Sequence, residues 1–217
     1  MIKRIKSFIR TKGIFKCLKL FCRYVWEYFW GHIVAFFMYD KRVLRGKCFR
    51  GKHHGFSNPG WHWAVIDFNT RFFLGVNRDI RFPISPNNSV TNPENIHFDP
   101  DDLRIFQGKG KYFQAIGASI TIGKGTFIAN NVGIITTNHD KSDLTQHTAG
   151  KEIIIGKECW IGFNSVILPG VVLGDNVVVG AGSIVTKSFP EGHCTIVGNP
   201  ARMIKSDNAA SSIKEEA

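Results

Sequence analysis

The sequence lacks an apolar run long enough to span a bilayer, and it lacks a recognisable cleavable leader. Its most apolar stretch, from Tyr24 to Tyr39, covers about 16 residues and is interrupted by Glu27 and His32, whereas a spanning helix needs roughly 20. The basic start is followed by no uninterrupted apolar segment and no clear small-residue cleavage site. We therefore expect neither a spanning helix nor a cleaved signal peptide.

Cysteine is scarce and forms no close pair of the metal-binding kind. The five cysteines are Cys17, Cys22, Cys48, Cys159 and Cys194. An odd number in an otherwise ordinary core predicts reduced thiols and a cytoplasmic protein. Zinc-finger spacing and an aromatic RNA-binding signature are also missing, which disfavours a nucleic-acid partner.

Acidic residues are few relative to basic ones. The chain carries 17 Asp and Glu against 28 Lys and Arg, a formal charge of +11. Such a balance predicts an anionic partner: nucleic acid, an acidic membrane surface, a polyanionic substrate or a phosphorylated cofactor. A length of 217 residues with 43% apolar content suits one globular domain with an appendage.

What the chain has in abundance is a six-residue repeat between residues 116 and 190. An aliphatic side chain recurs every six residues in two runs, at Ile116, Ile122, Ile128 and Ile134, and at Ile155, Ile161, Ile167, Leu173, Val179 and Val185. Glycine directly follows many of these positions, at Gly117, Gly123, Gly156, Gly162, Gly174 and Gly180. This period predicts a parallel β-helix with three units per coil. The aliphatic residues would stack along the axis, with glycines at corners that need positive φ or close packing.

Residues 1–60 precede the repeat as a basic extension. Residues 1–39 show amphipathic helical spacing, interrupted at Gly13. Such a helix suits the surface of an anionic membrane, which residues 1–40 would contact peripherally. The alternative is a helix that packs on the β-helix or at a subunit interface. His53 and His54 lie in the polar connector and are more consistent with a solvated loop than with a metal site.

Residues 61–115 contain a weaker form of the repeat. Phe68, Leu74 and Ile80 are six apart, as are Ile84, Val90 and Ile96. We expect degenerate coils here, with large residues filling the open end of the prism, because terminal repeats of solenoids are atypical. The cluster Asp99-Pro100-Asp101-Asp102 is interpreted as a loop or helix cap rather than an acid–base pair. The β-helix domain is thus predicted over residues 61–205, followed by a flexible tail at 206–217.

The repeat is interrupted once, and residues 136–153 must leave the prism as a polar loop. Loops held by a rigid scaffold commonly carry functional sites. His139 lies where the repeat gives way to this loop, and an imidazole can accept a proton near neutral pH. His139 is therefore the candidate general base. A backbone carbonyl, Asp140 or Asp143 could orient its ring.

Four segments together resemble the hexapeptide-repeat acyltransferases: IGKGTFIANNVGI, NHD, IGKECWIGFNSVILPGVVLGDNVVVGAGSIVTKSFP and GNPARMIK. The likeness covers roughly Ile116 to Lys205. It is nearest to the maltose, galactoside and nodulation-factor O-acetyltransferases and to O-acetyltransferases of bacterial surface polysaccharides. The resemblance implies a left-handed parallel β-helix, acetyl-CoA as acyl donor, and homotrimers with sites between subunits.

The resemblance also implies roles for individual residues. His139 would be the catalytic base and Trp160 would lie beside the site, unless Trp160 only packs at the trimer seam. Asn130, together with Asn138 and Asp140, would bind the acceptor, unless Asn130 only caps a turn of the coil. The cofactor wall would be formed by Gly162, Phe163, Gly180, Ala181, Gly182, Thr186 and Lys187, with Arg202 and Lys205 at the phosphates of coenzyme A. A backbone N–H near Gly162 and Phe163 would stabilise the oxyanion.

Metal binding is not expected. The γ-class carbonic anhydrases share this fold and hold zinc with three histidines. Here His139 and His147 lie on one polar loop with no third histidine at a matching repeat position, and His193 lies elsewhere.

The sequence therefore predicts an enzyme that moves acetyl from acetyl-CoA to a sugar hydroxyl in a ternary complex. The expected acceptor is a bacterial surface polysaccharide or its precursor, modified at the inner face of the cytoplasmic membrane. A small-sugar O-acetyltransferase and an amino-sugar-nucleotide N-acetyltransferase are the alternatives. A non-catalytic scaffold of the same fold is disfavoured, because His139 and the whole tail motif are present.

Overall fold

A computed structural model of the chain describes residues 13–50 and 57–206. The helices are α2 (Ile14–Met38), α3 (Lys47–Arg50) and α4 (Pro59–Leu74), with 3-10 turns η1 (Val43–Arg45), η2 (Pro93–Asn95) and η3 (Pro100–Phe106). The strands are β1 (Ser89–Thr91), β2 (Ile96–Phe98), β3 (Tyr112–Gln114), β4 (Ile120–Ile122), β5 (Phe127–Ile128), β6 (Gly133–Ile135), β7 (Ile153–Ile155), β8 (Trp160–Ile161), β9 (Val166–Ile167), β10 (Val172–Leu173), β11 (Val177–Val179), β12 (Ile184–Val185), β13 (Cys194–Gly198) and β14 (Ala201–Ser206). The predictions for residues 1–12, for His53 and His54, and for 207–217 lie outside the described residues.

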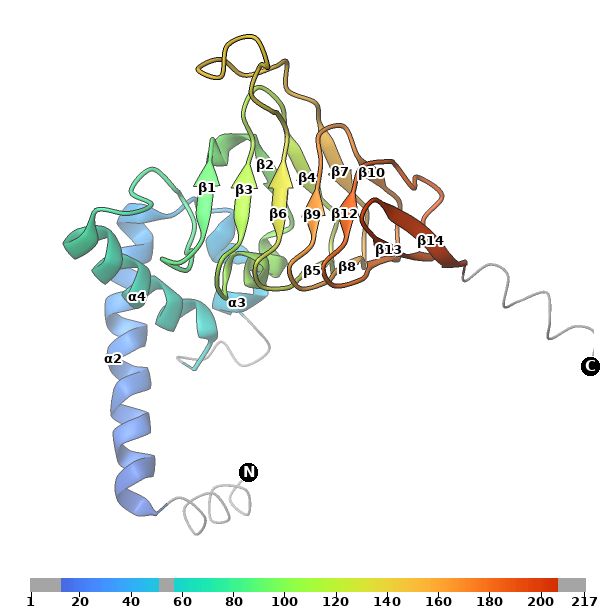
Figure 1. The fold of residues 1–217 in the computed structure, drawn as a ribbon. Coiled ribbons are helices and arrows are strands. Elements are labelled where there is room, and N and C mark those ends of the chain that lie inside the picture. Colours follow the sequence, from blue (N-terminus) through green and yellow to red (C-terminus); the bar gives the residue numbers. More distant parts are fainter. Residues whose placement is uncertain (1–12, 51–56, 207–217) are drawn as a thin grey trace, which may run out of the picture.

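The strands form three sheets that make the faces of a prism (Figure 1). Sheet A contains β1, β3, β6, β9 and β12; sheet B contains β2, β4, β7 and β10; and sheet C contains β5, β8, β11, β13 and β14. Each coil passes from A to B to C, and β3 rises in front of β4 while the coils advance toward the C-terminus (Figure 1), so the coil is left-handed. The predicted left-handed parallel β-helix with an N-terminal helical extension is confirmed.

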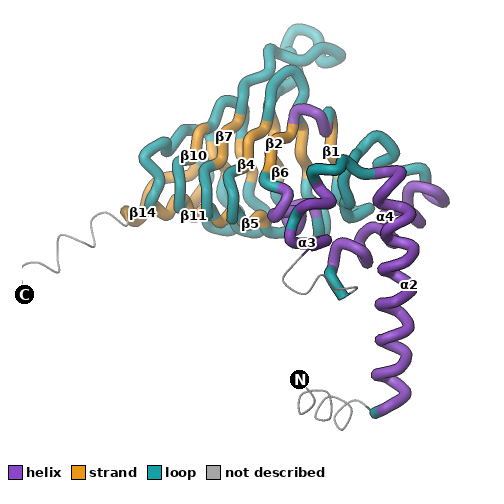
Figure 2. The backbone as a smooth tube through the Cα atoms, turned by 180° about the vertical axis from the view of Figure 1, so that it is seen from behind, coloured by secondary structure: helices purple, strands orange, loops and turns teal. Residues whose placement is uncertain are grey.

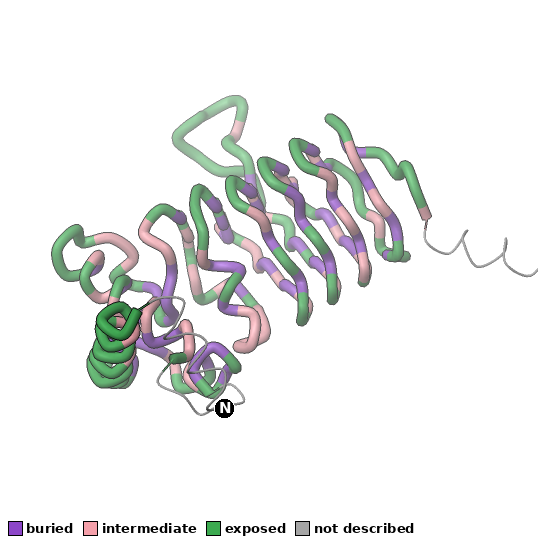
Figure 3. The backbone as a smooth tube through the Cα atoms, turned by 90° about the horizontal axis from the view of Figure 1, so that it is seen from below, coloured by how far each residue is buried: buried purple, intermediate pink, exposed green. Residues whose placement is uncertain are grey.

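The core of the prism consists of side chains stacked in register from coil to coil. On sheet A, Phe113 pairs with Ile134 and Ile134 with Ile167. On sheet C, Ile128, Ile161 and Val179 are aligned in the same way. All six side chains are buried, and burial of one such side chain contributes about 1.5–3 kcal/mol. The six-residue aliphatic frame therefore forms the continuous core that it predicts (Figure 3).

Glycines that follow frame positions serve close packing between coils. A Cβ on Gly123 would lie 2.4 Å from the carbonyl carbon of Gly156, and one on Gly156 would lie 2.5 Å from that of Gly174. Both approaches are to backbone, which cannot move aside cheaply. Positive φ at several corners is instead adopted by asparagine, as at Asn131 and Asn164, which tolerates this region better than most residues.

The first core position of the repeat lies three residues earlier than the spacing predicts, on strand β3. Ile116 is only half-buried, and Phe113, fully buried, occupies its place in the sheet A ladder. Phe113 and Ile122 on sheet B are nine positions apart, whereas Ile167 and Leu173 at the same corner of a later coil are six apart. The prediction of Ile116 as a core residue is therefore wrong.

The helical part continues past the predicted boundary at residue 60. Residues 59–74 form α4, so the prediction of degenerate coils from residue 61 is wrong for this stretch, including Phe68 and Leu74. Pro59 occupies the first turn and Gly75 ends the helix at φ 73, both of which are ordinary helix-boundary features. Trp61, Ala64 and Arg71 are buried at helical spacing, so this segment buries one face of a helix. The first coil begins only at β1, and η3 takes the place of its third strand.

Helix α4 packs against the second half of α2. Gly31 of α2 contacts the backbone of Trp61, where a Cβ would lie 3.1 Å from the carbonyl oxygen. Toward the C-terminal ends of the two helices, the buried Asp67 accepts a hydrogen bond from the Tyr39 hydroxyl at 2.5 Å and pairs with Arg71 at 2.7 Å. Burial raises the pKa of Asp67, and the Arg71 guanidinium opposes that rise. This network joins α4 to the end of α2, and both helices lie beside the β1 end of the prism (Figure 2).

The first half of α2 extends beyond both α4 and the prism (Figures 1 and 2). The buried residues of the whole helix α2 all lie in its second half; they are Glu27, Gly31, Val34 and Ala35. The exposed apolar side chains include Phe15, Leu18, Phe21, Trp26 and Phe29. Across residues 13–50 and 57–206, no helix combines the length and apolar character needed to cross a membrane.

The C-terminal end of the prism is closed by a change of strand direction. Strand β14 pairs antiparallel with β13, whereas every other strand pair is parallel among the described residues. The connecting turn contains Pro200, and most side chains of β14 are exposed. Sheet C therefore ends in an exposed strand that runs against the coils.

Candidate active site

The loop of residues 136–152 leaves the prism where the chain passes from sheet A to sheet B; we call this corner the loop edge. Hydrogen bonds close its base: the Thr137 hydroxyl donates to the Thr148 carbonyl at 2.7 Å, and the Lys151 amide donates to the Thr136 carbonyl at 2.8 Å. A β-bridge joins His139 to His147 further out. The loop is thus a hydrogen-bonded projection on a stiff support (Figure 1).

His139 is held in one tautomer by the backbone. Its Nδ1 lies 2.8 Å from the carbonyl oxygen of Leu144, and because a carbonyl can only accept, Nδ1 carries the proton. The Nε2 atom of neutral His139 is then the acceptor, which is the form a general base requires. The ring of His147 lies against it at a centroid distance of 4.5 Å, a contact that the sequence did not reveal.

The two aspartates of the loop do not contact the imidazole. Asp140 accepts hydrogen bonds from the amide and hydroxyl of Ser142, and Asp143 accepts the same pair from Thr145. These hydrogen bonds hold the pKa of both carboxyls below their usual value. The carboxylates therefore stabilise the turns of the loop, and the orienting group of His139 is the Leu144 carbonyl.

A different corner, where the chain passes from sheet C to sheet A, holds Asn130, Phe163 and Ala181 on successive coils. The backbone amides of these three residues donate to no group in the part of the chain that the structure describes. Since neighbouring coils lie about 4.8 Å apart, the free N–H groups form a column. We call this corner the amide edge.

Gly162 cannot supply the predicted oxyanion donor. Its amide donates to the Val179 carbonyl at 2.8 Å as part of the pairing between coils. The amide of Phe163 remains available, and the exposed Trp160 lies three residues earlier, on the outer face of sheet C. Asn130 also has a structural role, because its side-chain oxygen accepts the Lys109 amide at 3.1 Å.

The predicted site residues are divided between two edges of the prism. Asn130, Phe163, Gly180 and Ala181 lie at the amide edge, whereas Asn138 and His139 lie on the loop. Thr186 and Lys187 follow β12 at the loop edge, and Arg202 and Lys205 lie on β14. Sheet A separates the two edges, so one chain does not bring His139 to Asn130 or Phe163.

Comparison with known proteins identifies the family. A family model described as the hexapeptide repeat of succinyl-transferase matches residues 152–187. A provisionally named acetyltransferase of Dictyostelium discoideum is 47% identical over 170 residues, which cover 76% of this chain and 86% of that protein. This chain belongs to the hexapeptide-repeat acetyltransferases.

Other members of the family match over shorter segments. The Escherichia coli protein WbbJ, provisionally named a lipopolysaccharide biosynthesis O-acetyltransferase, is 36% identical over 111 residues, covering 46% of this chain and 56% of WbbJ. A solved structure of galactoside acetyltransferase in complex with coenzyme A is 32% identical, with a TM-score of 0.41, and the match covers 58% of this chain and 65% of that one. This chain spans about half the length of several curated relatives that it matches, among them WbbJ.

The amide edge borders a groove of about 440 Å³. Its walls include Trp63 of α4, Arg104 of η3, and Lys111, Phe127 and Phe163 of the coils. The sequence pattern did not single out Trp63, Arg104, Lys111 or Phe127. The one available signal was that Phe127 directly precedes a frame position, where an outward-facing side chain is expected.

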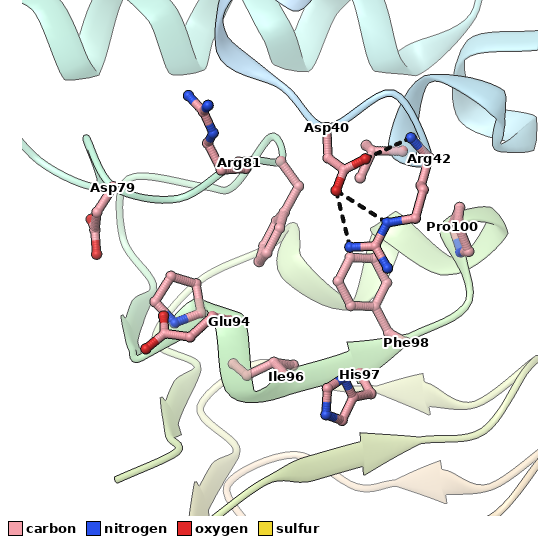
Figure 4. A pocket seen from close by; sticks show the side chains of 12 residues that line it. Asp40, Arg42, Asp79, Arg81, Glu94, Ile96, His97, Phe98 and Pro100 are labelled. Carbon is pink, nitrogen blue, oxygen red and sulfur yellow. Dashed lines mark hydrogen bonds and ion pairs between the residues drawn. The ribbon is translucent and has the colours of Figure 1, made fainter.

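Another cavity, of about 610 Å³, lies apart from both edges, between the helical part and the first coil (Figure 4). Charges of both signs line it, and Asp40 pairs with Arg42 at 2.9 Å inside it. None of the predicted site residues lines this cavity. In residues 13–50 and 57–206, no three His, Cys, Asp or Glu side chains gather in a way that could hold a metal ion.

Proposed function

We propose that this protein is an acetyl-CoA-dependent O-acetyltransferase that acts on a sugar hydroxyl. The observation that carries the proposal is the hydrogen bond from His139 Nδ1 to the Leu144 carbonyl, which leaves Nε2 as the proton acceptor. In this reaction Nε2 removes the hydroxyl proton while the oxygen attacks the thioester carbonyl. The tetrahedral oxyanion is stabilised by the free amide of Phe163, and the proton on Nε2 passes to the departing coenzyme A thiolate.

The acyl donor would lie along the amide edge. Glycine and alanine at positions 180 and 181 leave room for the pantetheine arm, and the free Ala181 amide can donate to one of its carbonyls. Arg202 and Lys205, on the exposed strand β14, would meet the phosphates, for which guanidinium and ammonium groups are suited. The surplus of basic residues across the chain favours such an anionic substrate.

The active unit would be a homotrimer. His139 lies at one edge of the prism and the free amides at another. In a closed ring, the loop edge of one subunit meets the amide edge of the next, since a heterologous interface joins two different surfaces. Each site would then take its base from one chain and its oxyanion donor and cofactor wall from a neighbour.

The acceptor is proposed to be a surface polysaccharide or its precursor, in keeping with the name of WbbJ, to which this chain is similar. The test is release of free coenzyme A thiol from acetyl-CoA with a panel of polysaccharides, small sugars and amino-sugar nucleotides. We expect one polysaccharide to stimulate release at least tenfold over the rate without acceptor. Stimulation by an amino-sugar nucleotide alone would assign N-acetylation instead, and the absence of any stimulation, with acetyl-CoA binding demonstrated, would reject acetyl transfer.

We also propose that α2 binds the inner face of an anionic membrane. Its projecting half exposes a broad apolar surface with Lys16, Lys19 and Arg23 on the same segment. Aromatic and basic residues together favour the interface of an anionic bilayer. The protein would then work in the cytoplasm beside membrane-attached acceptors.

The membrane proposal predicts the effect of removing two aromatic side chains. Phe15 is 84% exposed and Phe29 is 61% exposed. Burial of a phenylalanine in lipid contributes about 1.5 kcal/mol or more, so each Phe→Ser change should weaken binding to vesicles that contain anionic lipid about tenfold. Sedimentation of the full-length protein with vesicles measures this, with Phe73→Ser on α4 as a control of equal chemistry. Unchanged sedimentation with an altered oligomeric mass would assign α2 to a subunit interface.

A further inference from the structure

The groove at the amide edge has an unusual combination of side chains. Three aromatic residues, Trp63, Phe127 and Phe163, share it with two cations, Arg104 and Lys111, and with the amide of Asn130. No acidic side chain lines it among the described residues. Aromatic faces bind the apolar faces of sugar rings, and cations bind anionic substituents. Its volume of about 440 Å³ suits a small ligand or one part of a larger one.

Lys111 is a buried cation without a counter-ion. Its side chain and backbone are together only 3% exposed, and its Nζ donates to the carbonyls of Ile105 at 2.8 Å and Gln107 at 2.6 Å. An ammonium has three N–H donors, so one remains for a ligand. Desolvation lowers the pKa of Lys111 to about 8. An anion in the groove would offset the cost of burying this charge.

Arg104, from η3, supplies the second cation of the groove. It is exposed on η3, and among the described residues no carboxylate lies within ion-pair distance of Arg104 or Lys111. Guanidinium groups bind carboxylates through two parallel hydrogen bonds. The positive charges of Arg104 and Lys111 are therefore not neutralised by any described carboxylate.

The position of the groove connects it to the proposed reaction. Asn130 and Phe163 belong both to the groove and to the amide edge, where the free Phe163 amide is proposed to hold the oxyanion. A sugar bound in the groove would thus lie next to the reacting carbonyl. We propose that this groove selects an acidic acceptor, with Arg104 and Lys111 on the carboxylate of a uronic or sialic acid and the aromatic side chains against its ring. This inference rests on the proposed acetyl transfer and adds the class of acceptor.

The test compares acidic oligosaccharides with neutral counterparts of the same length. The acceptors are one uronic-acid and one sialic-acid oligosaccharide, each with its carboxyl-reduced form. For wild-type full-length protein, we expect kcat/KM to be at least tenfold higher for the acidic form of at least one pair. Because a hydrogen bond to a charged group is worth about 1.5–3 kcal/mol, Arg104→Gln and Lys111→Met should each lower this preference about tenfold, through KM.

Lys109→Gln is the matched control, because it removes the same charge two residues from Lys111 at a side chain that does not line the groove. It should retain the preference. If the Lys111→Met protein does not fold, Arg104→Gln still tests the preference for the acidic acceptor, because Arg104 is exposed. Calorimetric titration with the acidic oligosaccharide measures the binding affinity independently. Equal use of acidic and reduced acceptors would overturn the acidic-acceptor inference while leaving acetyl transfer intact. Loss of transfer to every acceptor, with no calorimetric binding of the acidic ones, would reject both.

Discussion

Replacing His139 with alanine is expected to lower acetyl transfer at least about a hundredfold, the contribution typical of a positioned general base. The affinity for acetyl-CoA should stay the same, because the donor is proposed to bind along the amide edge through Phe163 and Ala181, whereas His139 lies on the loop. Nε2 is the proton acceptor only while Nδ1 donates to the Leu144 carbonyl. His139→Gln should be as inactive as His139→Ala, since an amide can accept a hydrogen bond but cannot carry the proton away.

The measurement is acceptor-dependent release of coenzyme A thiol, with binding of acetyl-CoA followed separately. His97→Ala is a suitable control, because His97 is an exposed histidine on β2, away from both edges. It should keep full turnover. If His139→Ala retained more than a tenth of the wild-type rate, another group would have to be the base.

Mixing two inactive variants should restore activity, because each proposed site draws on two chains. His139→Ala removes the base at the loop edge, and Ala181→Trp fills the exposed cofactor wall at the amide edge. Each variant alone should lose nearly all turnover. In a ring of three, a site works where an intact loop edge meets an intact amide edge. Random co-assembly should therefore restore roughly a quarter of wild-type turnover, and the isolated mixed trimers roughly a third, because each has one working site of its three.

Co-expression with two different affinity tags isolates the mixed trimers for this measurement. The separately purified variants, combined without subunit exchange, should remain inactive and serve as the control. If verified mixed trimers stay inactive, then base and cofactor wall act within one chain, and the division of the site between subunits is wrong. A monomeric mass for active wild-type protein would contradict it equally.

The sequence predicts the prism well because its constraints are local and repeated. An aliphatic residue every six positions must be buried, and Gly156 is required because any Cβ would collide with the next coil. The same reasoning failed where the repeat is weak. Phe68 and Leu74 are six apart, but the spacing of Trp61, Ala64 and Arg71 buries one face of a helix, and Pro59 and Gly75 mark its ends. These helix signals prevail over the six-residue period, which carries no glycine between Trp61 and Leu74.

The site was predictable only in part, because its chemistry depends on long-range contacts. The sequence singles out His139, but not that Leu144 fixes its tautomer or that His147 lies against its ring. It suggests an oxyanion donor near residue 162, but only coil pairing shows that the Gly162 amide is occupied and the Phe163 amide is free. The groove needs Trp63, Arg104 and Phe127 from three separate elements. No local pattern reports that these side chains meet.

The reversed strand β14 also determines how long the prism can be. A stack of parallel coils has unpaired strand edges at each end, and such an edge can recruit another chain and grow into a fibre. At the C-terminal end, sheet C finishes on an antiparallel strand that exposes Arg202 and Lys205. At sheet C, a second prism would meet one strand of the opposite direction, with two cations exposed on it. The two cations proposed to hold coenzyme A would thus also keep the solenoid a discrete particle.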